Sequence, residues 1–276
     1  MRTSHICNTI PEKFTQAINR EIIEKPFHFC LITPMLGGDA ASWHLDTKNP
    51  VRGQSVKGQL RFWWRTMQHE TDATKLAHKE NSIWGGRILK ENGKEERIKS
   101  PVSFSIKDLK VQDIVPAEMA NRYAVKDDII PGYVLFPITS EVKKNDKNIH
   151  MIKTLDFSLS LVFPKELEST IMDVLKLWTL FGGIGARTRR GTGSLYCEEL
   201  LEDFQTEQDI RRFVNELANK GDGDSPINDS RLEYPRLKGS TLYAASVPDK
   251  SNKGTADVWH SLLESYGRYR QDRRPG

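Results

Sequence analysis

The sequence predicts an α+β fold in which strands and helices follow the order β-α-β-β-α-β. Three observations lead to this expectation. Residues 27–33 are rich in aromatic and β-branched side chains, a helical apolar stripe follows Ser55, and residues 155–161 alternate between apolar and polar before a second helix. The order is that of a ferredoxin-like (RRM-type) domain, here with an inserted segment in its middle.

The first strand and the first helix are separated by a loop. Residues 27–33 read FHFCLIT and stop at Pro34, which is typical of a strand that leaves a sheet. The loop contains Gly37-Gly38 and runs to about Gly53, and Ser55 is a suitable N-cap. Apolar residues then recur at helical spacing, which predicts one buried stripe, made of Val56, Leu60, Trp63 and Met67.

The second half of the domain contains a clearer strand and helix. Asn92-Gly93 indicates a hairpin turn that joins residues 87–89 to residues 102–106. The alternation over residues 155–161 predicts a half-buried strand. A helix follows and ends at Gly182-Gly183, before a short strand at residues 194–197. The apolar face of that helix consists of Ile171, Val174, Leu175, Trp178 and Phe181.

The pattern is weaker in the middle of the chain and beyond residue 200. Residues 221–226 read GDGDSP, which is typical of a surface linker, residues 133–138 and 241–247 favour strands, and residues 256–270 favour an amphipathic helix. We therefore expect two units, a ferredoxin-like domain over residues 1–200 and a second, partial unit with a C-terminal helix over residues 201–276.

The composition excludes several classes of protein. Of 276 residues, 37% are apolar and 28% charged, the net charge is +4 and the mean hydropathy is −0.56. No apolar run approaches the roughly 20 residues of a membrane span, and residues 1–20 lack the apolar stretch of a signal peptide, so a cytoplasmic protein without membrane contact is expected. The three cysteines form no C-x-x-C pair, and we expect neither a metal nor a cofactor.

Positive charge is concentrated in two stretches, of which the first surrounds the first helix. Residues 47–69 contain no acidic side chain, but they contain Lys48, Arg52, Lys57, Arg61 and Arg65. Arg52 precedes the helix, so its guanidinium and the N–H groups of the first turn are expected to hold one phosphate together. Trp63 is expected in the core. For Trp64, a core role and stacking on a base stay open.

The second stretch is the segment FGGIGARTRRGTGS, residues 181–194. No carboxylate occurs from Val174 to Cys197. Glycine lets a backbone approach a ligand closely, and arginine offers a planar fork for phosphate. A nucleotide-binding loop is disfavoured because the segment contains no Gly-Lys-Ser/Thr and has Thr188 where a dinucleotide fingerprint needs glycine.

These segments resemble the RAMP superfamily, the RNA-binding proteins of CRISPR systems. Within it, the likeness is greatest to the family of the first-numbered Cmr subunit of type III-B effector complexes. Its motifs in this sequence are ITPM with Gly37-Gly38, VRGQSVKGQLRFWWR at residues 51–65, IWGG at residues 83–86, and the segment at residues 181–194. The resemblance covers about residues 27–197, and more loosely residues 234–270.

The resemblance implies a ferredoxin-like RAMP fold whose glycine-rich loop precedes the last strand. It also implies a place at the end of a ribonucleoprotein, near the 3′ end of the CRISPR RNA, beside the backbone subunits and the sixth-numbered Cmr subunit. In the family this subunit helps to bind target RNA and is not regarded as the nuclease. Family members commonly continue beyond the point where this sequence stops, so the second ferredoxin-like unit is expected to be short or truncated.

The leading hypothesis is sequence-tolerant binding of the backbone of CRISPR RNA and target RNA, without a catalytic residue. The expected RNA-binding residues are Arg52, Lys57, Arg61, Trp64, Arg65, Gly182, Gly183, Gly185, Arg187, Arg189, Arg190, Gly191 and Gly193.

Three alternatives stay open. In a metal-dependent RNA endonuclease, Asp39 or Asp46, with His44 between them, would act near a bound phosphate. In a nuclease that processes CRISPR RNA, His28 or His44 would be the general base. A purely architectural subunit would use its basic patches to contact an acidic neighbour.

Overall fold

The structure is a computed structural model that describes residues 21–37, 45–89, 93–116, 134, 150–220, 234–242 and 255–272. The strand expected near residues 133–138, apart from Val134, the linker at 221–226 and most of the strand expected at 241–247 lie outside the described residues.

The fold is built on an antiparallel sheet. Strands β1 (Ile22–Leu31), β5 (Ser103–Pro116), β6 (His150–Pro164) and β7 (Leu195–Tyr196) lie in the order β5-β6-β1-β7. Each neighbouring pair is antiparallel, and a short strand β2 (Met35–Leu36) extends the sheet along the beginning of β6. A helix joins β1 to the β5–β6 pair and another joins β6 to β7, so the predicted ferredoxin-like α+β fold is confirmed.

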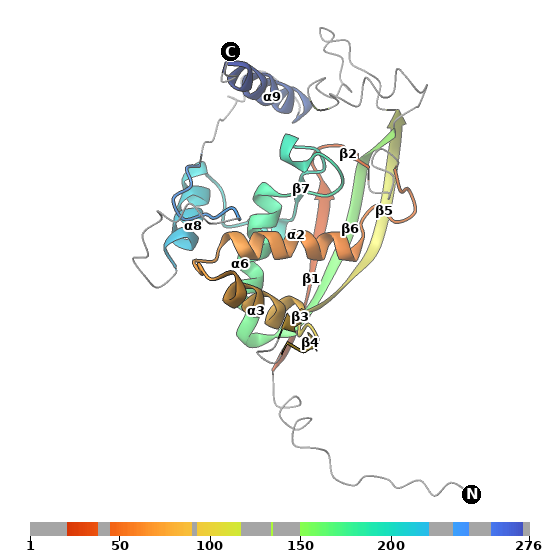
Figure 1. The fold of residues 1–276 in the computed structure, drawn as a ribbon. Helices are drawn as coiled ribbons and strands as arrows, with labels where there is room; N and C mark the ends of the chain where they lie inside the picture. The colour runs from red at the N-terminus through yellow and green to blue at the C-terminus, as the bar shows by residue number, and fades with distance from the viewer. Residues whose placement is uncertain are drawn as a thin grey trace, which may run out of the picture.

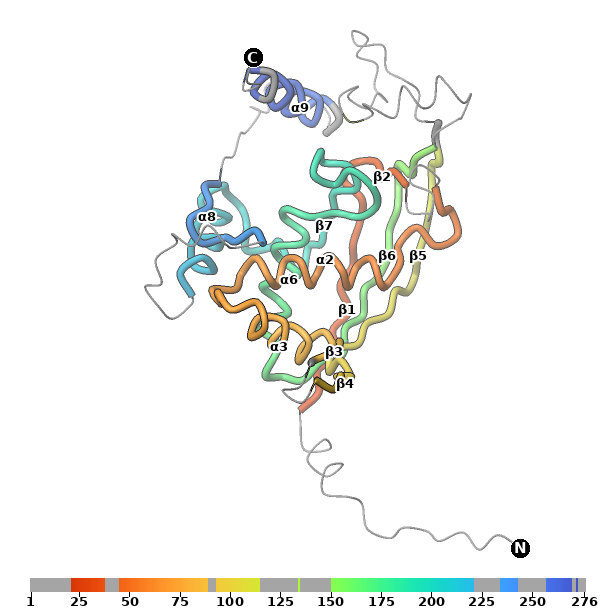
Figure 2. The backbone as a smooth tube through the Cα atoms, in the orientation of Figure 1, coloured from red at the N-terminus to blue at the C-terminus, as the bar shows by residue number. Residues whose placement is uncertain are grey.

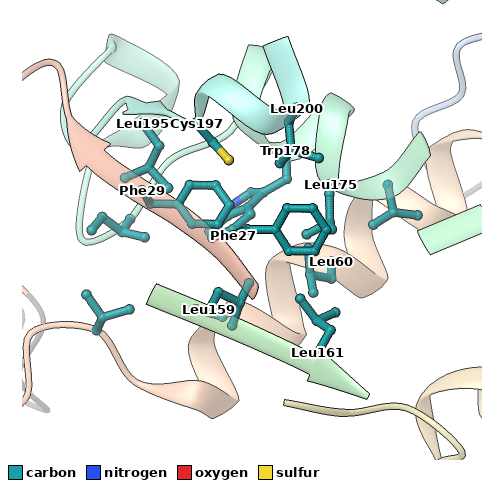
Figure 3. Close-up of a cluster of buried hydrophobic side chains, with 14 of the residues drawn as sticks. Phe27, Phe29, Leu60, Leu159, Leu161, Leu175, Trp178, Leu195, Cys197 and Leu200 are labelled. Carbon is teal, nitrogen blue, oxygen red and sulfur yellow. The ribbon is translucent and has the colours of Figure 1, made fainter. Parts of the chain in front are cut away.

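Helices α2 (Gly53–Thr66) and α6 (Glu168–Phe181) cover one face of this sheet (Figure 1). The predicted alternation in β6 is confirmed, since Leu155, Phe157, Leu159 and Leu161 are all fully buried. Phe29 of β1 stacks on Phe157 with ring centroids 5.2 Å apart. Figure 3 shows how side chains of β1 and β6 meet those of α2 and α6 in this core, with Leu60, Leu175 and Trp178 among them.

The inserted segment differs from the prediction. It contains α3 (Ala73–Trp84), β3 (Gly86–Leu89) and β4 (Glu95–Ile98). The expected pairing of residues 87–89 with residues 102–106 is wrong, because β3 pairs with β4, and Phe104 pairs with Leu161 of β6. β4 reads EERI, so it carries no alternation of apolar and polar residues that would have marked it as a strand.

Helices follow the last strand of the sheet. The short turns η1 (Lys165–Leu167) and η2 (Thr188–Arg190) lie before and after α6. The helices that follow β7 are α7 (Glu198–Leu201), α8 (Glu207–Asn219) and α9 (Thr255–Asp272). α9 confirms the helix expected at residues 256–270. Within the described part of residues 201–276 there is no strand, and the second ferredoxin-like unit stays a prediction. Among the described residues, every helix is too short or too polar to span a bilayer.

Candidate nucleic-acid interface

The glycine- and arginine-rich segment at residues 182–194, called the Gly/Arg loop below, is bonded to the end of β1 and to β2. Ser194 O accepts from Ile32 N at 2.8 Å, Gly193 N donates to Pro34 O at 3.0 Å, and Ala186 N donates to Leu36 O at 2.7 Å. Figure 2 shows the loop beside β2. Two motifs about 150 residues apart in the sequence therefore form one structural unit.

Two glycines allow this close packing. Gly185 has φ +80°, and a Cβ there would collide with Leu36 O. Gly193 has φ +66°, and a Cβ there would collide with Ile184 O. Both positions need a left-handed backbone and space that only glycine provides.

The three arginines of the loop come from a single tight turn. Arg187 has φ 62° and Gly191 has φ 75°, so a left-handed residue lies on each side of the 3-10 turn η2. Arg190 N donates to Arg187 O at 2.8 Å, and Gly191 N donates to Thr188 O at 2.9 Å. The turn brings three cations within four positions of the chain without an intervening acid.

The charges in this turn repel one another. Burial, together with the neighbouring charge of Arg190, lowers the pKa of Arg187. Arg189 is exposed, and within the described residues no carboxylate pairs with it. A bound phosphate would relieve this repulsion, since guanidinium groups bind its oxygens with charge-assisted hydrogen bonds.

The arginines of α2 are placed differently from the expectation. Arg61 Nε lies 2.5 Å from Glu80 Oε1, and Arg65 Nη1 lies 2.9 Å from the same oxygen. The Glu80 side chain is only 6% exposed. Arg61 and Arg65 therefore join α2 to α3 and share one compensating carboxylate, whereas their contact with RNA stays a prediction. Their partner Glu80 lies in α3, outside the acid-free residues 47–69 from which unpaired positive charge was expected.

The two basic stretches meet through aromatic side chains. The ring centroids of Trp63 and Phe181 are 6.0 Å apart, and a Cβ on Gly182 would lie 2.9 Å from Trp63 Nε1. Arg61 is two residues from Trp63, which places it about 200° away around the helix. The Gly/Arg loop and α3 consequently lie on different flanks of α2, as Figure 1 shows.

Trp64 is a core residue. Its exposed fraction is 3%, and it packs in the cluster that contains Leu60 and Trp84. Its ring is therefore enclosed by protein, and the possibility that it stacks on a base is corrected. Trp63, expected in the core, is only partly buried and packs against the core from the side of the loop.

The beginning of α2 carries two of the basic residues expected to bind RNA, Arg52 and Lys57. Arg52 occupies the N-cap position without a side-chain cap, and its Nη2 donates to Asp46 Oδ2 at 3.0 Å. Lys57 lies one turn into the helix, where burial and the charge of Arg61 lower its pKa. Among the described residues no carboxylate pairs with Lys57.

Asp46 has a structural role in the loop before α2. Its Oδ1 accepts from Asn49 N at 2.8 Å and from Lys48 N at 3.1 Å. These bonds and the one from Arg52 lower its pKa. Asp39 and His44, the other residues considered for a nuclease, lie outside the described residues.

Three residues at the loop were missed by the sequence interpretation. Thr33 Oγ1 donates to Gly191 O and accepts from Ser194 N. Thr192, which is fully buried, donates to Ala186 O at 2.6 Å. Trp259 of α9 donates from Nε1 to Arg190 O at 2.8 Å. The polar residues carry no spacing signal, and Trp259 is separated from the loop by more than sixty residues.

The comparison with protein families decides the classification. The sequence model of the RAMP superfamily matches residues 29–196, which is more than half of the chain. The chain belongs to the RAMP superfamily. The matched range contains α2, the sheet apart from the first residues of β1, and the whole Gly/Arg loop of this RAMP protein, but not α9.

Two individual proteins are similar to this RAMP protein. CRISPR system Cmr subunit Cmr1-1 of Pyrococcus furiosus is 31% identical over an alignment of 241 residues, and the match covers 79% of this chain and 65% of that protein. The chain thus spans 65% of the length of the curated relative it matches. The crystal structure of Cmr1 from Pyrococcus furiosus in its apo form has the same fold, with a TM-score of 0.58 and 21% identity over 91% of this chain and 73% of that one.

Proposed function

We propose that this RAMP protein is an RNA-binding, non-catalytic subunit of a type III-B (Cmr) CRISPR effector complex that acts in antiviral defence. Its similarity to a Cmr subunit supports the assignment to such a complex. The proposed ligands are the 3′ region of the CRISPR RNA and the target RNA. The proposed neighbours are the backbone subunits and the sixth-numbered subunit of the complex.

The observation that carries the proposal is the turn formed by residues 187–191. It carries Arg187, Arg189 and Arg190, Thr33 Oγ1 donates to Gly191 O, and the residues on either side of the turn bond to the segment from Ile32 to Leu36. A fixed turn with several guanidinium groups suits the phosphates of a single strand, and it reads no base edge. The binding should therefore tolerate sequence, while base pairing between guide and target provides the specificity.

The proposed interface is narrower than the one expected from the sequence. It consists of the Gly/Arg loop with its three arginines, and Arg52 and Lys57 are proposed as additional contacts. Arg61, Trp64 and Arg65 are left out, because the first and last are paired with Glu80 and Trp64 is buried.

Crosslinking tests this function. The chain would be purified with the other Cmr subunits and a CRISPR RNA, with target RNA added, and irradiated with ultraviolet light. We expect crosslinked peptides from residues 182–194 to carry nucleotides of the guide or the target. Crosslinks from this loop to protein alone would favour the architectural alternative, and cleavage of target RNA in Mg²⁺ that Asp46→Ala abolishes would favour the endonuclease.

A further inference from the structure

Helix α9 contacts the Gly/Arg loop through one aromatic side chain. Trp259 is 7% exposed, and its Nε1 donates to Arg190 O at 2.8 Å. The same indole lies against Gly191, where an added Cβ would be 2.7 Å from Nε1 and 3.1 Å from Cδ1. The ring therefore covers the peptide that joins Arg190 to Gly191.

Two successive carbonyl groups of the turn, those of Arg190 and Gly191, are held by different parts of the chain. Gly191 O accepts hydrogen bonds from Thr33 Oγ1, which lies between β1 and β2, and from Ser194 Oγ of the loop itself. Arg190 O accepts from Trp259, which comes from α9. The segment between β1 and β2 and the C-terminal helix thus hold adjacent carbonyl groups of the turn that carries the arginines.

The turn has a physical need for such support. It is flanked by the left-handed residues Arg187 and Gly191, and a left-handed arginine is unfavourable without surrounding contacts. The charges of Arg187 and Arg190 also repel each other. Both effects favour opening of the turn, and a buried hydrogen bond to Arg190 O opposes it.

We propose that Trp259 is a positioning residue, and that α9 acts as a clamp which holds the arginine-bearing turn in the conformation that binds phosphate. The part that concerns RNA rests on the proposed function, whereas the clamp itself does not. Since α9 lies outside the range matched by the RAMP superfamily, the clamp is supplied by a part of the chain beyond that common domain.

Hydrogen exchange of the free protein tests the clamp without RNA. The variants are Trp259→Phe, which keeps an aromatic ring but loses the N–H donor, and Trp259→Ala, which loses both. Leu262→Ala is the matched control, because Leu262 is 41% exposed on the same helix. The reporters are the amides of Arg190 and Gly191, which are hydrogen-bonded within the turn.

We expect exchange of these two amides to accelerate by about fivefold in Trp259→Phe, which corresponds to the loss of one neutral hydrogen bond, and by more in Trp259→Ala. The control should leave them unchanged. Unchanged exchange in Trp259→Ala, or the same acceleration in the whole chain, would overturn the clamp. Should Trp259→Ala fail to fold, Trp259→Phe decides by the same criterion.

RNA binding then tests what the clamp is for. Trp259→Ala should reduce the dependence of RNA affinity on salt toward that of the Arg187/Arg189/Arg190→Ala variant. When Trp259→Ala is combined with the three arginine substitutions, RNA affinity should not fall further. An additive loss, or a loss with an unchanged salt dependence, would overturn the positioning role. If the unmutated protein binds no RNA, the proposed function fails, and the exchange experiment still decides the clamp.

Discussion

Glu80 of α3 accepts a hydrogen bond from Arg61 of α2 at 2.5 Å, and its carboxylate is almost completely buried. Arg65 bonds to the same carboxylate through both oxygens. One acid therefore compensates two arginines that the sequence alone presents as a free basic stripe. The charge of this helix serves mainly to fix α3 on α2, which leaves the Gly/Arg loop as the cationic surface of interest.

Removal of the Glu80 charge should destabilise the fold. In Glu80→Gln the two guanidinium groups would repel each other beside a neutral amide, and we expect a loss of about 1–3 kcal/mol, less than for a fully buried pair because both arginines are partly solvated. Urea denaturation measures it. Glu95→Gln is the control, since Glu95 is exposed in its pair with Arg87 and should change stability by less than about 0.5 kcal/mol. Equal effects of the two substitutions would contradict the interpretation of Arg61 and Arg65.

Two substitutions of glycine by alanine should have opposite signs. Gly193→Ala places a Cβ against Ile184 O at a positive φ, so we expect destabilisation of more than about 2 kcal/mol. Gly58 lies within α2 with open space around its Cα, and Gly58→Ala should stabilise by about 0.5–1 kcal/mol through helix propensity. Thermal unfolding compares the two. A Gly193→Ala protein as stable as the original would show that the loop is not packed as described.

Trp64 should affect stability and not RNA affinity. Trp64→Phe leaves part of a fully enclosed volume empty, and a loss of about 1–3 kcal/mol is expected from reduced burial. The RNA affinity of the folded variant should stay unchanged. Phe62→Ala is the control on the same helix, because Phe62 is 36% exposed and should cost less stability. Loss of RNA affinity in folded Trp64→Phe would restore the stacking role that burial argues against.

Asp46 should contribute to stability at acid pH. Its pKa lies below the ordinary value of 3.8 because Asn49 N, Arg52 and Lys48 N bond to the ionised carboxylate. The folded state therefore binds the proton less readily than the unfolded state, so this contribution is complete above the unfolded pKa and is lost as pH falls through the folded one. We expect the stability of Asp46→Asn to fall less steeply below pH ~4 than that of the original protein. The free energy of unfolding of both proteins would be measured by denaturation at a series of pH values. The same decrease below pH ~4 in both proteins would contradict the bonding described for this loop.

The sequence predicted those features that depend on neighbours along the chain. The alternation of Leu155, Phe157, Leu159 and Leu161 reflects the sheet face that they bury, and the spacing of Val56 and Leu60 reflects the buried stripe of α2. The glycines of residues 182–194 marked a backbone that no other residue could follow, and the structure explains two of them by contacts with Leu36 and Ile184.

Features that depend on distant residues could not be predicted in the same way. Arg61 and Arg65 lie in a stretch without acids, but Glu80 reaches them from a helix whose packing direction no local pattern reveals. Trp64 differs from Trp63 by a rotation of about 100° around α2, which decides between the core and the flank that faces the loop. Trp259 is brought to Arg190 by tertiary packing alone.

The central claim is that Arg187, Arg189 and Arg190 bind RNA phosphates, and the salt dependence of binding tests it most directly. The variant with all three changed to alanine would be titrated with single-stranded RNA of unrelated sequences over a range of salt concentrations. The control changes Arg87, Lys165 and Arg212 to alanine, which removes the same charge from exposed, ion-paired positions. We predict that affinity falls similarly for every RNA, and that the slope of log affinity against log salt decreases by about 2, or roughly 0.7 for each lost contact. A slope and an affinity equal to those of the control would contradict the account.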